Sequence, residues 1–342
     1  MSTFNKPIEI ARLRHQALKA IRSYFDTQEF LEIDAPVLID ANAVEAFIDP
    51  VSLTVNNPDG SQRKAFLATS PEIYMKRLLS CGADRIYSLG PVFRDREGSP
   101  KHLIEFTMLE WYRKNVELDA LEKDCADLFR NLHSALKPFS STALLNLEAP
   151  FDRISVAQAW AEYAQIDLEV CLQRIADGEQ QALAQLLCEK GEYIGRNADF
   201  DHVFSHVMLK YIEPAIGQKR PCVLYDWPAQ TAALARLVPN NPLFAQRFEI
   251  YWCGVELANA FCELTDPTEQ RSRFEEANRI RRSIEREELP VPEPFLRDLS
   301  RMPPASGIAV GIDRLIAIMC GQLNIRNVKP LANHLILQQF LR

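Results

Sequence analysis

The stretch 247–264 constrains the fold more than any other part of the chain, because it reads as two strands joined by a tight turn. Aromatic and β-branched residues fill both arms, and the turn falls near Cys253-Gly254. A β-hairpin of this kind must pair with further strands or pack against helices to be stable. The chain therefore contains a sheet, and this hairpin is part of it.

Two glutamates of the hairpin carry the first chemical signal. If Trp252 and Cys253 occupy the centre of the turn, Glu249 lies directly opposite Glu256. Directly opposed residues have Cβ atoms about 5 Å apart, where like charges destabilise a sheet. Such a pair needs a proton or a cation, and oxygen-only ligation suits Mg²⁺, especially one carried by nucleotide phosphates. Glu249 and Glu256 are therefore candidate metal ligands.

The other polar positions of the hairpin require an irregularity in the second strand. Three residues share one face at period two: Asn259, Phe261 and Glu263. Glu256 has the opposite parity, so all four face one cavity only if a β-bulge lies around Leu257-Ala258. The alternative is an edge hairpin with solvated glutamates and a core phenylalanine.

Composition is typical of a globular protein and excludes several classes. Of 342 residues, 47% are hydrophobic and 25% are charged. No apolar run reaches the ~18 residues of a membrane span and the polar start lacks a signal-peptide core, so we expect a cytoplasmic protein without membrane contact. The net charge of −7 disfavours a general nucleic-acid-binding face. The eight cysteines form no CxxC pair, which indicates reduced packing residues.

Hydrophobic periodicity predicts helices and short strands within one large domain, 1–342. The expected helices are 9–27, 73–80, 118–136 and 266–287, with a mostly helical region at 155–211. The expected strands are 30–36, 51–55, 65–67, 86–94, 105–113, 223–225 and 306–311. We predict an α+β fold in which a largely antiparallel sheet of about six strands is flanked by helices, with a helical insertion at about 140–205.

Two strands carry further candidate residues. On strand 105–113, one face holds Phe106, Met108, Glu110 and Tyr112. A carboxylate on an apolar face needs a partner, either a cationic ligand or a structural arginine. Small residues along 306–311 allow a planar ligand to lie close to the backbone, and Arg314 can reach a phosphate or stack on a base. The chain has no P-loop and no GxGxxG, so a bound nucleotide would lie on an antiparallel sheet.

Three stretches resemble the signature motifs of class II aminoacyl-tRNA synthetases of the lysyl branch. They are 30–36, then 92–94 through 105–110, and 307–314. The resemblance covers the chain from about residue 12 to 322 and implies that family's catalytic fold. The runs 105–112 and 256–259 are its most specific parts.

Two features resemble a narrower family, the elongation factor P (R)-β-lysine ligases. The chain starts at the catalytic-domain helix, so we expect no anticodon-binding domain and no stable tRNA binding. Ala309 stands where lysyl-tRNA synthetases have glycine, and one methyl on a pocket wall discriminates ligands by ~1–3 kcal/mol. The resemblance implies ATP-dependent transfer of β-lysine to a lysine of elongation factor P by a homodimer.

The resemblance also implies roles for individual residues. Arg94 would hold the α-phosphate and the substrate carboxylate, and Arg94 with Arg314 would be catalytic. The nucleotide set would be Arg94, Arg96, Leu103, Phe106, Glu256, Leu257, Gly311 and Arg314, with Phe106 and Arg314 on either side of adenine. Glu249 and Glu256 would hold Mg²⁺. The lysine-like substrate would meet Ser70, Glu72, Glu110, Tyr112, Asn259, Phe261, Glu263 and Ala309.

The second motif departs from the family pattern. Arg94-Asp95-Arg96 replaces Arg-Asn-Glu, and 102–106 reads His-Leu-Ile-Glu-Phe in place of His-Asn-Pro-Glu-Phe. Arg96 and Leu103 offer backbone groups, and Arg96 a cation near phosphate, but neither accepts a bond from the adenine amino group. Two alternatives to the ligase function stay open: α-lysine activation for a tRNA or small amine, and a non-catalytic regulatory paralogue. The altered motif favours the second of them.

Overall fold

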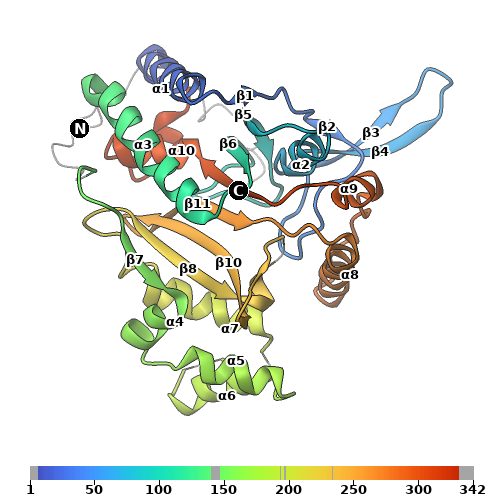
Figure 1. Cartoon of the computed structure of the whole chain (residues 1–342), viewed down its shortest axis with the longest axis vertical. Helices are drawn as coiled ribbons and strands as arrows, with labels where there is room; N and C mark the ends of the chain where they lie inside the picture. The colour runs from blue at the N-terminus through green and yellow to red at the C-terminus, as the bar shows by residue number, and fades with distance from the viewer. Residues whose placement is uncertain (1–6, 140–146, 193, 196–197, 233, 331–342) are drawn as a thin grey trace, which may run out of the picture. The chain divides into compact units, whose positions relative to one another are not determined.

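The computed structural model describes residues 7–139, 147–192, 194–195, 198–232 and 234–330 (Figure 1). The chain divides into two compact units, one from 1–145 and 265–342 and the other from 146–264. The start of the predicted helical insertion, 140–146, lies outside the described residues. Among the described residues, none of the helices combines the length and the hydropathy that a membrane crossing requires.

The first unit contains a sheet in the order β1-β5-β6-β12. Its strands are β1 (Leu31–Glu32), β5 (Arg85–Phe93), β6 (Glu105–Lys114) and β12 (Ala305–Gly311). β1 pairs parallel with β5, whereas β6 pairs antiparallel with both β5 and β12. A small antiparallel sheet adds β2 (Leu38–Ile39), β4 (Gln62–Leu67) and β3 (Ser52–Asn56) in that order.

Helices cover the sheet of the first unit. They are α1 (Pro7–Thr27), α2 (Glu72–Ser80), α3 (Leu118–Leu136), α8 (Pro267–Ser283), α9 (Glu293–Leu299) and α10 (Ile312–Met319), with 3₁₀ turns at Lys137–Phe139 and Ile325–Val328. α1 packs against α3, as Figure 1 shows, and the hydroxyl of Tyr24 donates to the carbonyl of Asp124 at 3.1 Å. Phe25 of α1 stacks on Tyr87 of β5 with ring centroids 4.5 Å apart. These contacts bury the apolar stripe that predicted the first helix.

The helix α8 begins as predicted but ends earlier. The Asp266 carboxylate accepts from the backbone nitrogens of Thr268 and Glu269, at 2.8 and 3.3 Å, and so caps the helix. The predicted end at Glu287 is wrong, because the helix stops at Ser283 and Glu285 has a φ of 58°. A non-glycine residue in the left-handed region interrupts helical hydrogen bonding.

The strands of the second unit are hydrogen-bonded in the order β11-β10-β8-β7. Its strands are β7 (Asp152–Ser155), β8 (Cys222–Pro228), β9 (Leu237–Val238), β10 (Asn241–Trp252) and β11 (Val255–Cys262), with β9 pairing on β10. The helical part comprises α4 (Val156–Ala159), α5 (Leu168–Ala176), α6 (Ala182–Glu189) and α7 (Phe200–Val207), with π-helical turns at Trp160–Ala164 and Met208–Ile212 and a 3₁₀ turn at Ala229–Thr231. Trp160, Phe204 and Trp227 anchor a core shared by these helices and β8. Strand β7 was missed because its four residues alternate too briefly to be detected.

The strands of each unit pair mainly antiparallel, with β1–β5 and β7–β8 as parallel pairs, and helices pack against them, so the predicted α+β class is confirmed. The single catalytic domain stays a prediction.

Candidate active site

The turn of the β10–β11 hairpin differs from the register considered from sequence. Trp252 pairs with Val255, which leaves Cys253 and Gly254 as the two turn residues. Both have positive φ, 51° and 67°, as a two-residue type I′ turn requires. A turn centred on Trp252 and Cys253 is therefore wrong.

A bulge in β11 changes which residues lie opposite each other. Ile250 pairs with Ala258 and Tyr251 pairs with Glu256, so Leu257 is the extra residue. The bulge lies where the sequence predicted one, and it brings Glu256 onto the face shared by Asn259 and Phe261. Glu249 lies opposite Asn259 instead of opposite Glu256.

The charge of Glu256 still acts on Glu249. Burial raises the pKa of Glu249 from 4.5 to about 8, with the nearby Glu256 charge as the second cause and Arg247 opposing both. The Glu249 carboxylate is 4% exposed, accepts from Arg247 Nη2 at 2.5 Å and accepts from the hydroxyl of Tyr251 at 2.7 Å. Within the second unit, the Glu256 charge is therefore near enough to disfavour the charged form of Glu249.

Arg247 organises the same face, and the sequence reasoning gave it no role. Its Nε donates to the side-chain oxygen of Asn259 at 3.1 Å, and its guanidinium carbon lies 4.3 Å from the ring centroid of Trp227 and 5.6 Å from that of Phe261. The sequence did contain a signal for the contact between Arg247 and Glu249. The two residues are two positions apart, so their side chains lie on the same face of the strand.

Among the described residues, no group of three or more His, Cys, Asp and Glu side chains forms a cluster that could hold a metal ion. Mg²⁺ bound to nucleotide phosphates needs only one or two protein carboxylates, because phosphates and water supply its other ligands. Glu249 and Glu256 offer oxygen donors, and their mutual repulsion is the kind that a cation relieves. Their chemistry fits the predicted ion.

In the first unit, Arg94 follows β5 and lies against β6. Its backbone nitrogen donates to Ile104, and its guanidinium carbon lies 5.2 Å from the ring centroid of Phe106. The Nε atom of Arg94 is buried, and within the described part of the chain it has no hydrogen-bond partner. A buried guanidinium nitrogen without a partner is costly, so this atom suits an anionic ligand.

Beyond Phe106, the same strand carries a buried carboxylate and a phenol. Glu110 is 3% exposed and accepts a hydrogen bond of 2.5 Å from the hydroxyl of Tyr112. Ala309 lies directly opposite Glu110, and Gly307 lies opposite Tyr112. Directly paired residues share a face, so the small side chains of β12 leave room beside the carboxylate.

Glu72 stands in the first turn of α2 and is 7% exposed. Its carboxylate accepts from Lys76 Nζ at 2.5 Å, one helical turn further on. Ser70 precedes it, and the Ser70 hydroxyl accepts from the Glu72 backbone nitrogen at 3.4 Å. Sequence reasoning missed Lys76, although the i,i+4 spacing from Glu72 was a usable signal.

Gly311 caps α10, and Asp313 and Arg314 lie in the first turn of that helix. Arg314 Nε donates to the carbonyl of Lys101 at 3.1 Å. The Asp313 carboxylate, 2% exposed, accepts from Arg14 Nη1 at 2.5 Å and from the backbone nitrogen of Thr107 at 2.9 Å. Asp313 therefore connects the start of α10 to the residue after Phe106.

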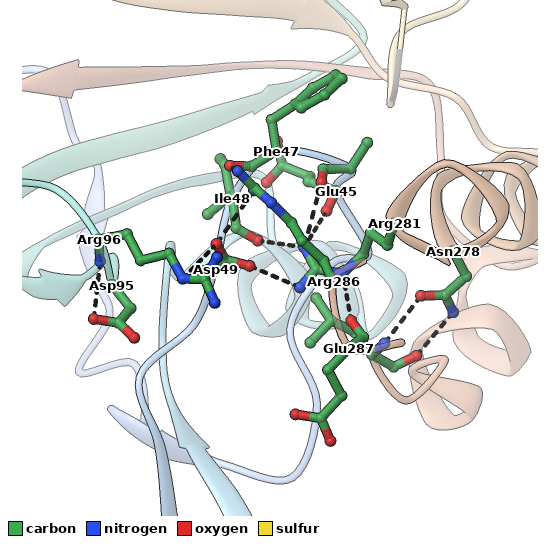
Figure 2. Close-up of polar contacts among 12 residues, drawn as sticks. Glu45, Phe47, Ile48, Asp49, Asp95, Arg96, Asn278, Arg281, Arg286 and Glu287 are labelled. Atoms are coloured by element: carbon green, nitrogen blue, oxygen red, sulfur yellow. Dashed lines mark hydrogen bonds and ion pairs between the residues drawn. The ribbon is translucent and has the colours of Figure 1, made fainter. Parts of the chain in front are cut away.

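The altered second motif is connected to Asp49, a half-buried aspartate. Figure 2 shows Asp49 with Arg96 on one side and Arg281 and Arg286 on the other. Arg96 has a φ of 61° and lies 3.6 Å from the Asp49 carboxylate, while Asp95 donates its backbone nitrogen to the carbonyl of Asp49 at 2.7 Å. Leu103 is 5% exposed and buried.

Within each unit, several of the residues predicted to form the site lie together. In the first unit, Arg94 lies against Phe106 while Glu110, Tyr112 and Ala309 adjoin on β6 and β12. In the second unit, one face of the hairpin holds Glu249, Glu256, Asn259 and Phe261. Glu263 follows β11 and is 1% exposed.

Sequence comparison identifies the class of protein to which this fold and these side chains belong. The family described as "tRNA synthetases class II (D, K and N)" matches residues 3–334, and the chain belongs to that family. Three of its relatives are named "Elongation factor P--(R)-beta-lysine ligase", in agreement with the resemblance seen in the sequence. They come from Haemophilus influenzae strain PittGG (34% identical, covering 91% of each chain), Avibacterium paragallinarum (36%, 92% of each chain) and Edwardsiella ictaluri (35%, 93% of this chain and 94% of the relative).

Proposed function

We propose that this protein uses ATP to activate (R)-β-lysine and transfers it to a lysine side chain of elongation factor P. The family and the names of its relatives support this proposal. The observation that carries it is the composition of β6, which has Phe106 beside Arg94 at one end and Glu110 with Tyr112 further along. One strand therefore offers chemistry for a nucleotide and for an ammonium group.

In the first step, a carboxylate oxygen of β-lysine attacks the α-phosphorus of ATP. The bond to the bridging oxygen breaks, pyrophosphate leaves and an aminoacyl-adenylate forms. Arg94 stabilises the negative charge of the transition state, which fits its buried Nε without a partner in the described chain. Phe106 and Arg314 lie on the two faces of adenine, and Gly311 allows close approach of the base.

Glu249 and Glu256 would hold Mg²⁺ through carboxylate oxygens. The ion supplies positive charge that neutralises the phosphates. The raised pKa of Glu249 supports this assignment, because a cation offsets the cost of burying a carboxylate beside a second negative charge. Leu257, the extra residue of the bulge, maintains the alignment of Glu256 with Asn259.

The ammonium groups of β-lysine are assigned to the carboxylates Glu72, Glu110 and Glu263, helped by Ser70, Tyr112 and Asn259, with Phe261 and Ala309 as apolar walls. A doubly charged cation gains from several acidic partners. The methyl of Ala309 beside Glu110 disfavours one lysine isomer on steric grounds.

In the second step, the acceptor lysine of elongation factor P, in its neutral amine form, attacks the carbonyl carbon of the adenylate. An amide bond forms, the bond to phosphate oxygen breaks and AMP leaves, while the amine loses a proton. Arg96 and Leu103 replace side chains that read adenine in the family pattern. Arg96 would instead exchange Asp49 for a phosphate as its partner, since the ion pair with Asp49 is long, at 3.6 Å, and the Arg96 side chain is 69% exposed.

The protein is further proposed to be a cytoplasmic homodimer without stable tRNA binding. Strand β1 is at the edge of its sheet and Leu31 is 62% exposed. A cavity of about 290 Å³ next to it is lined partly by Arg22, Glu32 and Ser88. An exposed strand edge is a common surface for pairing. Light scattering of the purified protein tests the dimer, and a monomer would contradict it.

The test of function is pyrophosphate exchange with each lysine isomer, followed by mass spectrometry of elongation factor P incubated with ATP and β-lysine. We expect faster exchange with (R)-β-lysine and addition of one β-lysyl group. Faster exchange with α-lysine contradicts the proposal. Absence of an adenylate with both isomers favours a non-catalytic paralogue, in line with the altered second motif.

A further inference from the structure

In the first unit, the buried Lys76 lies beside Glu72, which is proposed to bind the substrate. The side chain of Lys76 is 1% exposed, whereas that of Glu72 is 10% exposed, and the two are joined at 2.5 Å. Lys76 Nζ also lies 6.0 Å from the ring centroid of Tyr112, whose hydroxyl donates to Glu110. Glu72, Lys76, Tyr112 and Glu110 therefore form a continuous series of contacts from α2 to β6.

The burial of Lys76 requires the pair with Glu72 to be maintained. An ammonium that leaves water loses several kcal/mol of solvation, so it stays charged only with a partner carboxylate. Lys76 Nζ binds Oε1 of Glu72, and we assign Oε2 to the contact with a substrate ammonium. The salt bridge also restricts the rotation of a side chain that otherwise has three flexible torsions.

We propose that Lys76 is a positioning residue that sets the discrimination between lysine isomers by fixing the Glu72 carboxylate. The inference rests on the proposed function, in which Glu72 binds an ammonium group. The α and β isomers differ in the attachment of one amino group by a single carbon, a shift of about 1.5 Å. A carboxylate held in place distinguishes that shift, whereas a freely rotating glutamate follows the amino group and accepts both isomers.

Lys76 also determines the charge of this part of the molecule. Its positive charge offsets that of Glu72, with which it forms an ion pair. Without Lys76, two negative charges would attract any diamine of suitable length. With Lys76 in place, the choice between lysine isomers depends on the position of the amino group and not on the total negative charge around it.

The experiment measures pyrophosphate exchange at saturating ATP and Mg²⁺ for the wild type and Lys76→Met. The expected result is a KM for (R)-β-lysine raised about tenfold or more and a β-to-α ratio of kcat/KM lowered at least about fivefold, with the KM for ATP changed less than about twofold. Lys64→Met is the matched control, because Lys64 pairs with Glu287 at the surface and its side chain is 44% exposed. It should match the wild type.

Two further variants separate positioning from folding. Lys76→Arg keeps a cation beside Glu72 but changes its shape, so it should fold and still lose part of the isomer discrimination. The double variant Glu72→Gln and Lys76→Met removes both charges, and it should show the same isomer ratio as Glu72→Gln alone. That equality is the signature of a residue that acts through Glu72.

The outcomes are distinguishable from failure of the proposed function. A wild type that exchanges pyrophosphate with neither isomer refutes the proposed function, and this inference with it. An active wild type whose Lys76 variants keep the wild-type isomer ratio refutes the inference alone. Equal changes in the KM for ATP and for β-lysine would show a general structural role and also refute it.

Discussion

The protonation of Glu249 depends strongly on its surroundings. Burial and the Glu256 charge raise its pKa to about 8, while Arg247 opposes the shift. A carboxyl group with a raised pKa in the folded state stabilises the protein below its ordinary value of 4.5. That contribution is lost as the pH rises through the folded pKa, because the folded state must then hold a costly charge.

The Glu249→Gln variant removes this titration. Its melting temperature should therefore fall less than that of the wild type as the pH increases from about 5 to about 8. Thermal unfolding followed by circular dichroism across that interval measures the difference. Asp59→Asn is the control, since Asp59 is an exposed turn residue with a lowered pKa. A constant difference between Glu249→Gln and wild type across the interval would contradict the coupling.

At the residue scale, sequence predicted more of the chemistry than of the geometry. The proximity of Glu249 and Glu256 was anticipated, and so was the bulge at Leu257. The register was not, because a hairpin turn can be centred on either of two adjacent residue pairs until φ is known. The partner of Glu249 was also missed, since 39 basic and 46 acidic residues leave too many possible pairs.

At the scale of elements, the buried Arg281 of α8 forms hydrogen bonds to the loop 45–49. Arg281, 2% exposed, donates to the carbonyls of Glu45 and Ile48 at 3.1 and 2.9 Å and to the carboxylate of Asp49 at 2.8 Å. Its Nε donates to the carbonyl of Glu287 at 2.7 Å (Figure 2). These bonds explain why the chain turns after Ser283 instead of continuing as a helix.

Replacing Arg281 by methionine should therefore destabilise the protein by about 3–5 kcal/mol, because the carbonyls of Glu45, Ile48 and Glu287 lose a donor and Asp49 loses one of its arginine partners. Arg279→Met tests the same substitution on the exposed side of α8, where the side chain is 63% exposed and pairs with Glu276. That control should change stability by less than ~0.5 kcal/mol. Urea denaturation of both variants measures the effect, and equal midpoints would refute it.

A second contact between elements supports the nucleotide residues. Asp313 in α10 accepts from Arg14 of α1 and from Thr107 of β6. Phe106 and Arg314, which are proposed to enclose adenine, are each the sequence neighbour of a residue in this network. The first helix is therefore coupled to the position of both.

Asp313→Asn should raise the KM for ATP about tenfold, since a displacement of the enclosing groups by a fraction of an ångström weakens binding. The KM for β-lysine should change much less, because Glu110 is held by Tyr112. Steady-state pyrophosphate exchange with one substrate varied at a time measures both. A variant with the two constants altered equally would exclude a specific role for Asp313.

For the whole molecule, local patterns predicted local structure well. The helix α1, the cap at Asp266 and the strand β6 are close to their predicted limits. Contacts between distant parts of the chain could not be predicted, as with Arg14 and Asp313, which lie 299 residues apart. One sequence holds no signal for which acidic residue meets which arginine across that distance.

Binding of substrate should stabilise the whole protein. ATP with Mg²⁺ at 100 times its dissociation constant adds about 2.7 kcal/mol to the stability of the native state. The melting temperature should therefore rise with ATP concentration in the wild type. The Arg94→Ala variant should show little rise, because it lacks the proposed phosphate contact, and an equal shift in both proteins would contradict that role.

The extra residue at Leu257 allows the hairpin to lose one residue without a change of face. Side chains on a strand alternate between its two faces, so a deletion from a regular strand would reverse every position that follows. Here Tyr251 pairs with Glu256 and Ile250 with Ala258, so a chain without Leu257 would keep both pairs and would lose only the bulge. Natural variants that lack this residue are therefore expected to keep Asn259 and Phe261 on the face that they share with Glu256.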